Sequence, residues 1–319
     1  MIKFENVSKR YEDGTVAVHS LHLEIKQGEF FVFIGPSGCG KTTTLKMINR
    51  LIPLSDGTIF IDGKKISTYD IHELRWNIGY VLQQIALFPH MTIEQNITVV
   101  PEMKKWPKEK MKQRAYELMN MVGLDPENYA DRKPNELSGG EQQRIGVIRA
   151  LAADPEIILM DEPFSALDPI SREKLQDDMI DLKRNLKKTT VFVTHDMQEA
   201  LKLADRICIM KDGKIVQVGT PQELVTNPVN DFVREFVGEK YGNWPHIDLE
   251  EMVQPLEPSE MHSSIVIPVS TAFSKLLDLL SDHEQLAVEK DGKQIGVINR
   301  QNLIQFLSAH MPERGMTDE

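Results

Sequence analysis

Short apolar runs separated by turn residues dominate the first sixty residues of the chain. The five consecutive apolar residues Phe30–Ile34 predict a central strand that is buried on both faces. A helix is predicted over Lys41–Arg50, and Asp62-Gly63 is a hairpin signal. The other strands expected in this part of the chain are Ile2–Val7, Ala17–Ile25 and Thr58–Ile61.

The pattern changes in residues 92–136, where Met, Lys and Glu recur at helical spacing, as in Lys108–Val122. We interpret this segment as a helical insertion. Strand-sized apolar runs then return, with helical patterns between them: Ile157–Met160, Thr190–Thr194 and Arg206–Met210. An alternation of strands and helices predicts an α/β fold with a parallel sheet.

The last eighty residues have a different organisation. Residues 238–260 are rich in Pro, Gly and acidic side chains, which is typical of a linker after a domain at 1–237. A polar tail, expected to be mobile, occupies 311–319. Residues 261–310 predict a small α+β module with strands at Ser264–Ile267, Gln285–Glu289 and Gln294–Asn299, helices at Thr271–Ser281 and Arg300–Ala309, and a turn at Asp291-Gly292.

Composition narrows the classes of function. The formal net charge of −11 disfavours a nucleic-acid-binding surface, but not the binding of a small phosphate-bearing ligand, because backbone N–H groups and one lysine can hold phosphates locally. The two cysteines suggest neither a disulfide nor a zinc site, as expected in a reducing cytosol. No apolar run approaches the roughly 20 residues of a membrane span, and no signal peptide is expected. A function at a membrane therefore requires another chain.

A phosphate-binding loop lies between the central strand and the first helix. Its glycines let the backbone approach a phosphate, Lys41 can reach the β and γ oxygens, and the Thr42 hydroxyl can bind Mg²⁺. The positive end of the following helix also faces the phosphates. The nucleotide-binding residues expected here are Gly35, Pro36, Ser37, Gly38, Cys39, Gly40, Lys41, Thr42 and Thr43.

Two carboxylates follow the strand Ile157–Met160. Asp161, at the strand end, can hold Mg²⁺ through water, and Glu162 can act as the general base for the attacking water. Taken alone, Asp-Glu-Pro is equally well explained as the start of a turn. The phosphate loop upstream favours the metal and the base.

Three further side chains are weaker candidates. His195 follows the strand Thr190–Thr194 and can contact the γ-phosphate, and Gln83 can contact Mg²⁺ or the water. Tyr11 can stack on adenine. A lone His is usually structural and a lone Gln is usually solvated, while Tyr11 is about equally well explained as a plain surface aromatic, so these assignments depend on the whole set of motifs.

A second glycine-rich segment, Ser138-Gly139-Gly140-Glu141, opens a helix that we expect to continue from Gln142. Ser138 and Glu141 fit a capping box, and the helix start is also a second anion site. Because one helix start seldom serves the same phosphate as a distant loop of the same domain, we infer that it serves a nucleotide held by a partner chain.

Together these motifs resemble the ATP-binding cassette of ABC transporters over residues 1–237. Tyr11 matches the aromatic loop, Gly35–Thr42 the Walker A motif and Gln83 the Q-loop. The remaining matches are Leu137–Gln142 with the signature, Ile157–Glu162 with Walker B, Ser165–Asp168 with the D-loop and His195 with the switch histidine. The resemblance implies ATP and Mg²⁺ as cofactors and a head-to-tail homodimer with Ser138 and Gly140 acting across it.

Within this family the chain looks like the ATPase subunit of bacterial quaternary-amine importers, which carry glycine betaine, carnitine or choline. Gly79–His90, Thr194–Ile207 and the segment from Ile215 to Gly238 carry this resemblance. It implies attachment to the cytoplasmic face of the cell membrane through separate permease subunits, an extracytoplasmic substrate-binding protein and no nucleic-acid partner. Residues 261–310 resemble a single CBS motif, with Val297 and Asn299 near its nucleotide-type groove. Because such motifs usually pair, the module either pairs with its twin in a partner chain or is vestigial.

Two alternatives stay open at this point. One is an importer of another small solute, such as a polyamine or a sugar, although the helix–strand pattern after Glu260 disfavours a sugar-type β-rich barrel. The other is a soluble ABC ATPase of translation or DNA repair, which the single cassette, the compact helical insertion and the acidic charge disfavour.

Overall fold

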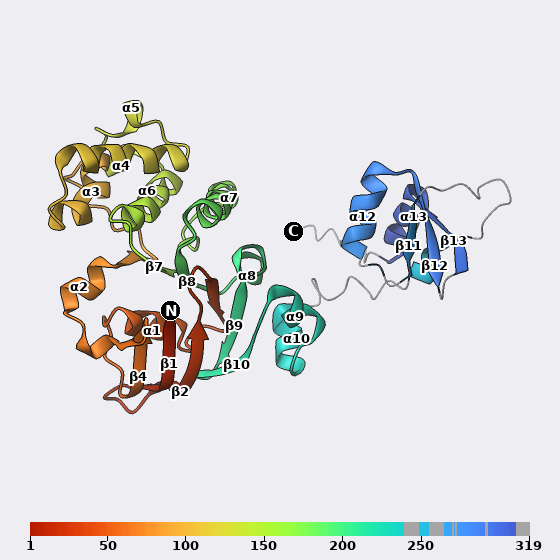
Figure 1. Ribbon diagram of the computed structural model, residues 1–319, viewed down its shortest axis with the longest axis horizontal. Coiled ribbons are helices and arrows are strands. Elements are labelled where there is room, and N and C mark those ends of the chain that lie inside the picture. The colour runs from red at the N-terminus through yellow and green to blue at the C-terminus, as the bar shows by residue number, and fades with distance from the viewer. Residues whose placement is uncertain (239–248, 255–264, 270, 272, 291–292, 311–319) are drawn as a thin grey trace, which may run out of the picture. The chain divides into compact units, whose positions relative to one another are not determined.

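The chain forms two compact units, Met1–Gly238 and Glu239–Glu319 (Figure 1). The computed structural model describes residues 1–238, 249–254, 265–269, 271, 273–290 and 293–310. Within them, no helix combines the length and the apolar character needed to cross a membrane.

The first unit is built on a six-stranded sheet in the order β10-β9-β3-β8-β7-β6. Neighbouring strands from β9 to β6 are parallel, and β10 is antiparallel to β9. The strands of this sheet are β3 (Phe30–Ile34), β6 (Ile78–Val81), β7 (Ile157–Asp161), β8 (Thr189–Thr194), β9 (Arg206–Lys211) and β10 (Lys214–Gly219). The predicted parallel α/β sheet is therefore confirmed.

A second, antiparallel sheet covers one side of this unit, in the order β2-β1-β4-β5. Its strands are β1 (Ile2–Arg10), β2 (Val16–Ile25), β4 (Asp56–Ile61) and β5 (Lys64–Lys65). The hairpin expected at Asp62-Gly63 joins β4 and β5, and both turn residues have positive φ, as a type I′ turn requires. Asp212-Gly213 makes the same kind of turn between β9 and β10.

Strand β3 belongs to two hydrophobic cores, which explains its uninterrupted apolar sequence. Phe30, Val32 and Ile34 pack into a core with the helices, whereas Phe31 and Phe33 pack into a core with the antiparallel sheet. All five side chains are at most 2% exposed. Because successive side chains of a strand point to opposite faces, a strand between two cores has no polar position.

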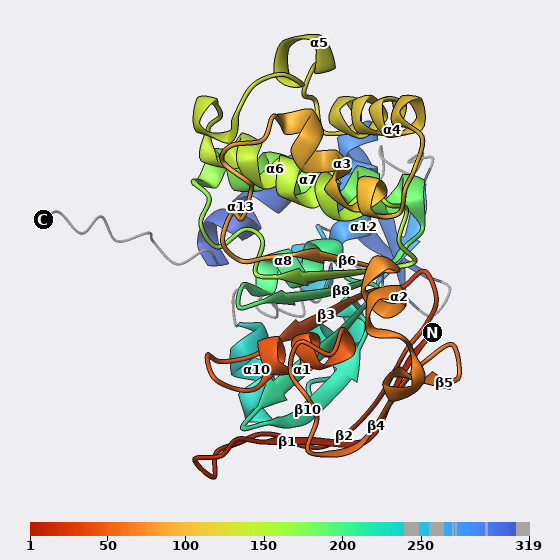
Figure 2. The same ribbon diagram turned by 90° about the vertical axis from the view of Figure 1, so that its left-hand side faces the viewer.

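Helices form the rest of the first unit (Figure 2). The expected helical insertion contains α3 (Ile93–Met103), α4 (Lys108–Met121) and α5 (Pro126–Tyr129), which form a layer with α6 (Gly139–Leu151). Helix α6 begins at Gly139, three residues earlier than predicted, because Ser138 caps it. The other helices are α1 (Lys41–Ile48), α2 (Ile71–Trp76), α7 (Pro169–Leu186), α8 (Met197–Leu203), α9 (Pro221–Thr226) and α10 (Asp231–Val237).

The second unit has a three-stranded sheet in the order β11-β12-β13. Strand β11 (Val266–Pro268) is parallel to β12 (Gln285–Lys290), which is antiparallel to β13 (Lys293–Asn299). Helices α12 (Phe273–Asp282) and α13 (Arg300–His310) complete it. The element order matches the prediction for 261–310, but the start of the first expected strand, the Asp291-Gly292 turn and the tail 311–319 lie outside the described residues.

Part of the predicted linker belongs to the core of this second unit. Leu249 and Met252, in the 3₁₀ turn Leu249–Met252, are 1% and 4% exposed and pack with the apolar side chains of the module. Gln254 forms an antiparallel bridge with Val297 of β13. The linker assignment is therefore wrong for 249–254, and the rest of the predicted linker after Gly238 lies outside the described residues.

Candidate functional site

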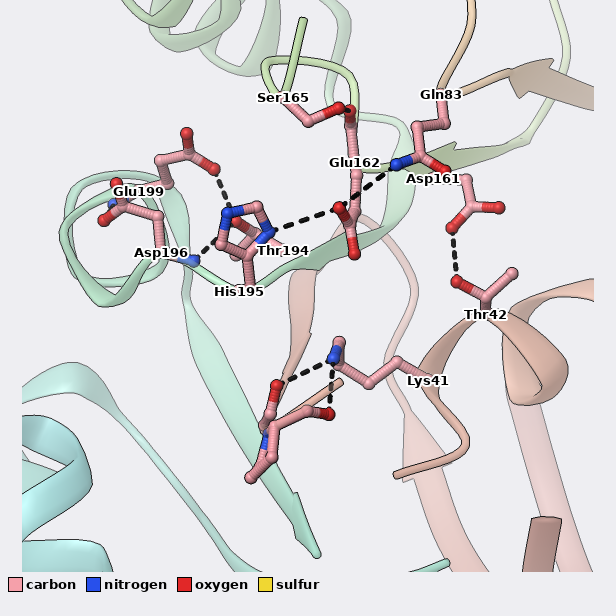
Figure 3. A network of polar contacts seen from close by, with 12 residues as sticks. Lys41, Thr42, Gln83, Asp161, Glu162, Ser165, Thr194, His195, Asp196 and Glu199 are labelled. Atoms are coloured by element: carbon pink, nitrogen blue, oxygen red, sulfur yellow. Dashed lines mark hydrogen bonds and ion pairs between the residues drawn. The ribbon is translucent and has the colours of Figure 1, made fainter. Parts of the chain in front are cut away.

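The strand order of the large sheet brings four predicted segments to one edge. Strands β3, β8, β7 and β6 are consecutive neighbours and run parallel. Their carboxyl ends therefore lie side by side, and the residues that follow them face one crevice, as is general for open α/β sheets. These are the phosphate loop after β3, His195 after β8, the end of β7 with Glu162, and Gln83 beyond β6 (Figure 3).

The phosphate loop is shaped by close backbone contacts. A Cβ atom on Gly35 would lie 2.1 Å from the Met210 carbonyl oxygen, and one on Gly40 would lie 2.3 Å from that of Ala17. Both glycines have positive φ, as does Gly38, around which there is open space. Only glycine fits at 35 and 40, so the sequence closes the loop tightly against its neighbours.

Lys41 is the first residue of α1, and its ammonium group turns back into the loop. The Nζ atom donates to the carbonyl oxygens of Gly35 at 2.7 Å and Pro36 at 3.1 Å. The residue is 5% exposed. This buried cation lies at the centre of the loop, where phosphate oxygens can replace the carbonyl partners. Cys39, also buried, lies beside it, and burial raises the pKa of its thiol.

Asp161 is held by three side chains from two elements. The Thr42 hydroxyl donates to Oδ1 at 2.7 Å, Tyr80 donates to Oδ2 at 3.3 Å, and Lys46 Nζ lies 3.5 Å from Oδ2. Burial, together with the charge of Asp161, raises the pKa of Tyr80. Sequence reasoning missed Lys46 and Tyr80. The available signals were that Lys46 follows Thr42 by one helical turn and that Tyr80 lies on the strand next to β7.

The donor set around Asp161 suits Mg²⁺. A hydroxyl and a carboxylate meet at 2.7 Å directly beside the phosphate loop, and both are the hard oxygen ligands that this ion takes. Mg²⁺ typically uses one or two carboxylates together with substrate phosphates and water rather than a cage of side chains. Accordingly, no group of three or more His, Cys, Asp or Glu suited to a metal occurs within the described part of the chain.

Glu162 is the point at which the predicted catalytic residues meet. Its Oε2 lies 3.2 Å from His195 Nδ1 and accepts a hydrogen bond from Gln83 Nε2 at 3.4 Å (Figure 3). Its backbone is left-handed, with φ of 46°, and its N–H donates to the Val193 carbonyl at 3.0 Å. This turn directs the carboxylate out of the strand direction toward the crevice. Three predicted side chains from three strand ends are thereby brought together.

Tyr11, at the end of the antiparallel sheet, also reaches this region. Its hydroxyl lies 3.4 Å from Thr43 Oγ1 on α1, and the residue is 39% exposed. The Lys9 ammonium lies 5.1 Å from the ring centroid. The ring is therefore next to the phosphate loop and open to a planar group.

The glycine-rich segment at the start of α6 is in a different layer from the phosphate loop (Figure 2). Ser138 caps the helix: its hydroxyl oxygen accepts from the Glu141 N–H at 3.3 Å, and Glu141 accepts from the Ser138 N–H at 2.7 Å, which confirms the predicted capping box. Burial opposes ionisation of Glu141, but hydrogen bonds from Tyr129 and Ser138 and the charge of Arg144 outweigh it and lower its pKa.

The two glycines of this segment have different surroundings. A Cβ atom on Gly140 would lie 2.7 Å from Ser171 Oγ, so helix packing already explains that glycine. Gly139 has helical geometry and nothing within 4 Å of an added Cβ. Because no described residue of this chain packs against position 139, the space in front of it is open to a group outside the chain.

Comparison with known proteins agrees with the motifs. The family described as ABC transporter matches residues 18–165. The glycine betaine/carnitine/choline transport ATP-binding protein OpuCA of Bacillus subtilis is 56% identical over 304 residues, which cover 95% of this chain and 77% of the relative. The chain belongs to the ATP-binding proteins of ABC transporters.

Two further relatives extend this ABC transporter assignment. The osmoprotectant import ATP-binding protein OsmV of Salmonella typhimurium is 49% identical over 307 residues, which cover 94% of this chain and 79% of the relative. The dimeric structure of an ATP-binding cassette in a post-hydrolysis state, bound to ADP and Pi, matches with 38% identity and a TM-score of 0.62. That match covers 69% of this chain and 99% of the other. The expected ABC fold of the first unit is confirmed, whereas the CBS resemblance stays a prediction.

Proposed function

We propose that this protein is the ATP-hydrolysing subunit of a bacterial importer for quaternary amines of the glycine betaine, carnitine and choline class. The observation that carries the proposal is the 56% identity to a protein of that name over nearly the whole chain, together with Glu162, His195 and Gln83 meeting beside the phosphate loop. An importer for a polyamine or a sugar has no comparable support.

Each side chain of the crevice has a role in this reaction. The loop Gly35–Thr43 and the Lys41 ammonium bind the phosphates of ATP, and Tyr11 stacks on the base. Thr42 and Asp161 would hold Mg²⁺, with Gln83 near it, and the bound ion would supply positive charge to neutralise the phosphates. Glu162 accepts the proton of the attacking water, while His195 and Gln83 orient its carboxylate. The product of this step is ADP and inorganic phosphate.

The segment Ser138–Gly140 is proposed to act on a nucleotide held by a second copy of the chain. It lies in a separate layer from the phosphate loop, and the open space at Gly139 has no role within one chain. The dimeric cassette bound to ADP and Pi supports a homodimer. The arrangement would place two ATP molecules between two chains.

A crosslinking experiment tests this arrangement. Chains carrying Ser37→Cys are mixed with chains carrying Gly139→Cys, both in a Cys39→Ala background; the remaining Cys208 is fully buried. With ATP and without hydrolysis, a covalent dimer is expected under oxidising conditions, since the phosphate loop of one chain faces the α6 start of the other. Each of the two variant chains alone is the control. Absence of the mixed dimer in the presence of ATP contradicts the arrangement.

A segment next to the site is suited to contact a permease subunit. Arg149 Nη1 of α6 donates to the Ala86 carbonyl at 2.6 Å, and the buried Asn96 side chain bonds to both backbone groups of Phe88. The segment nevertheless exposes apolar side chains, with Leu82 at 39% and Phe88 at 41%. This segment, residues 82–88, includes Gln83. We propose that permease subunits bind here and hold the protein at the cytoplasmic face of the membrane, with a separate binding protein delivering the solute.

An uptake assay tests the proposed substrate class. In the source bacterium under high osmolarity, uptake of radiolabelled glycine betaine, carnitine or choline is expected to fall to background when the gene carries Glu162→Gln. Polyamine and sugar uptake should be unchanged in the same cells. Loss of polyamine or sugar uptake, with quaternary-amine uptake intact, would overturn the substrate assignment.

The C-terminal module is proposed to pair with its twin in a partner chain. The sequence of this module resembles one CBS motif, and the structure has Val297 buried and Asn299 at the end of β13. Residues 244–319 contain thirteen acidic and five basic side chains. A sequence with this excess of negative charge is repelled by anionic lipid, so pairing fits the charge better than binding to a membrane surface.

A further inference from the structure

A carboxyl group is buried directly behind the loop that carries His195. Glu199, in the first turn of α8, is 5% exposed, and its Oε2 accepts a hydrogen bond of 2.5 Å from the Thr194 hydroxyl. The same hydroxyl oxygen accepts the Asp196 N–H at 3.0 Å. The two residues on either side of His195 are therefore joined through one hydroxyl, and Glu199 fixes the orientation of that hydroxyl (Figure 3).

Burying the Glu199 carboxyl costs free energy, and capping of α8 does not explain why this group is buried. Burial raises the pKa of its carboxyl, and the Thr194 hydrogen bond opposes this rise. Asp196 already caps the helix by accepting the N–H groups of Gln198 at 2.7 Å and Glu199 at 3.4 Å. In an ordinary capping box the carboxylate would accept the Asp196 N–H itself. Here the Thr194 hydroxyl lies between the Glu199 carboxylate and the Asp196 N–H, so the carboxylate bonds to the end of β8 instead.

His195 depends on its backbone for orientation. Its side chain is 61% exposed, and among the described residues its ring hydrogen-bonds to Glu162 alone. Packing does little to hold an exposed ring in place. The direction of the His195 Cα–Cβ bond therefore decides whether Nδ1 lies 3.2 Å from Glu162 Oε2. That direction is set by the backbone between Thr194 and Asp196.

We propose that Glu199 is a positioning residue for ATP hydrolysis: through the Thr194 hydroxyl it sets the His195 backbone, and thereby the contact between His195 and Glu162. The inference rests on the proposed function. The positive charge of Arg172, which donates to the Leu167 carbonyl at 3.4 Å, also opposes the rise that burial causes in the pKa of Glu199.

Removing either end of the Thr194–Glu199 hydrogen bond tests the proposal. In the full chain, Thr194→Val and Glu199→Ala are each expected to lower kcat about ten-fold, with KM for ATP within about two-fold, because a small displacement of a catalytic group affects turnover more than binding. Glu199→Gln retains an acceptor for the hydroxyl and is expected to restore most of the kcat. The matched control is Thr189→Val, which removes a buried hydroxyl that bonds to Gly28 at the other end of β8.

A double-mutant cycle separates positioning from simple stabilisation of α8. If Glu199 acts through His195, adding Glu199→Ala to His195→Ala causes no further loss of kcat. A full additional loss in that background, or an equal loss of kcat in Thr189→Val, overturns the proposal. Thr194→Val and Glu199→Gln carry the test if Glu199→Ala does not fold.

A readout without turnover distinguishes this inference from the proposed function. The ring nitrogen signals of His195, assigned by their absence in His195→Ala, are expected to shift in Thr194→Val and to stay unchanged in Thr189→Val. A chain that hydrolyses no ATP but shows this shift would contradict the proposed function and leave the positioning role intact. Unchanged signals in Thr194→Val, in a chain that hydrolyses ATP, would refute the positioning role alone.

Discussion

The Glu162→Gln variant is expected to bind ATP as tightly as the unchanged chain and to lose at least about 100-fold in turnover, the scale of general base catalysis. Glutamine has the same shape as glutamate, and its carbonyl oxygen can still accept a hydrogen bond from Gln83, so the crevice keeps its geometry. Only the group that takes the proton from water is lost. With hydrolysis blocked, ATP should stay between two chains.

Two measurements on one preparation check this expectation. Phosphate release gives the turnover, and size-exclusion chromatography with and without ATP shows whether a nucleotide-dependent dimer accumulates. Glu109→Gln is the matched control, because Glu109 is exposed in the first turn of α4, away from the crevice. Turnover in Glu162→Gln close to that of Glu109→Gln would remove Glu162 from the role of base.

Replacing Lys41 by alanine is expected to weaken ATP binding itself by about ten- to a hundred-fold. The estimate follows from the roughly 1.5–3 kcal/mol that a hydrogen bond to a charged group contributes. The ammonium is buried in the loop and bonded to the Gly35 and Pro36 carbonyls, so its charge is poorly screened there. Binding of a fluorescent ATP analogue measures the change.

The two variants should therefore fail at different steps. Lys41→Ala should lose the complex, while Glu162→Gln should keep the complex and lose the reaction. Lys108→Ala, which removes an exposed lysine at the start of α4, is the control for net charge. An ATP affinity of Lys41→Ala within two-fold of the Lys108→Ala affinity would show that the backbone alone holds the phosphates.

The sequence was sufficient for those parts of the fold and site that local patterns determine. Strand β3 lies where five apolar residues predicted it, because a strand between two cores tolerates no polar side chain. Gly35 and Gly40 were likewise predicted from the local loop motif, and each closes the loop against one backbone carbonyl. The positions of Glu162 and His195 after predicted strands were visible in the sequence, but their meeting with Gln83 depends on the sheet order.

What the sequence could not provide depends on tertiary contacts. Lys46 and Tyr80 contact Asp161 from a helix and a neighbouring strand, and the sequence alone assigned neither residue a role in the site. Leu249 and Met252 lie among acidic residues, so composition assigned them to a linker, whereas contacts with the module place them in a core. Glu199 has the ordinary sequence of an N-terminal helical turn, and its function is visible only from the bond to Thr194.

The left-handed backbone of Glu162 lowers the stability of the fold at the same position that supplies the catalytic carboxylate. For a residue with a Cβ, this conformation costs on the order of 1 kcal/mol, whereas glycine adopts it freely. Glycine at 162 would therefore relax the turn after β7 and leave nothing to take a proton. Glycine, the residue that would stabilise this turn, has no group that can take a proton. The chain therefore has a less stable turn here, with a carboxylate that points into the crevice.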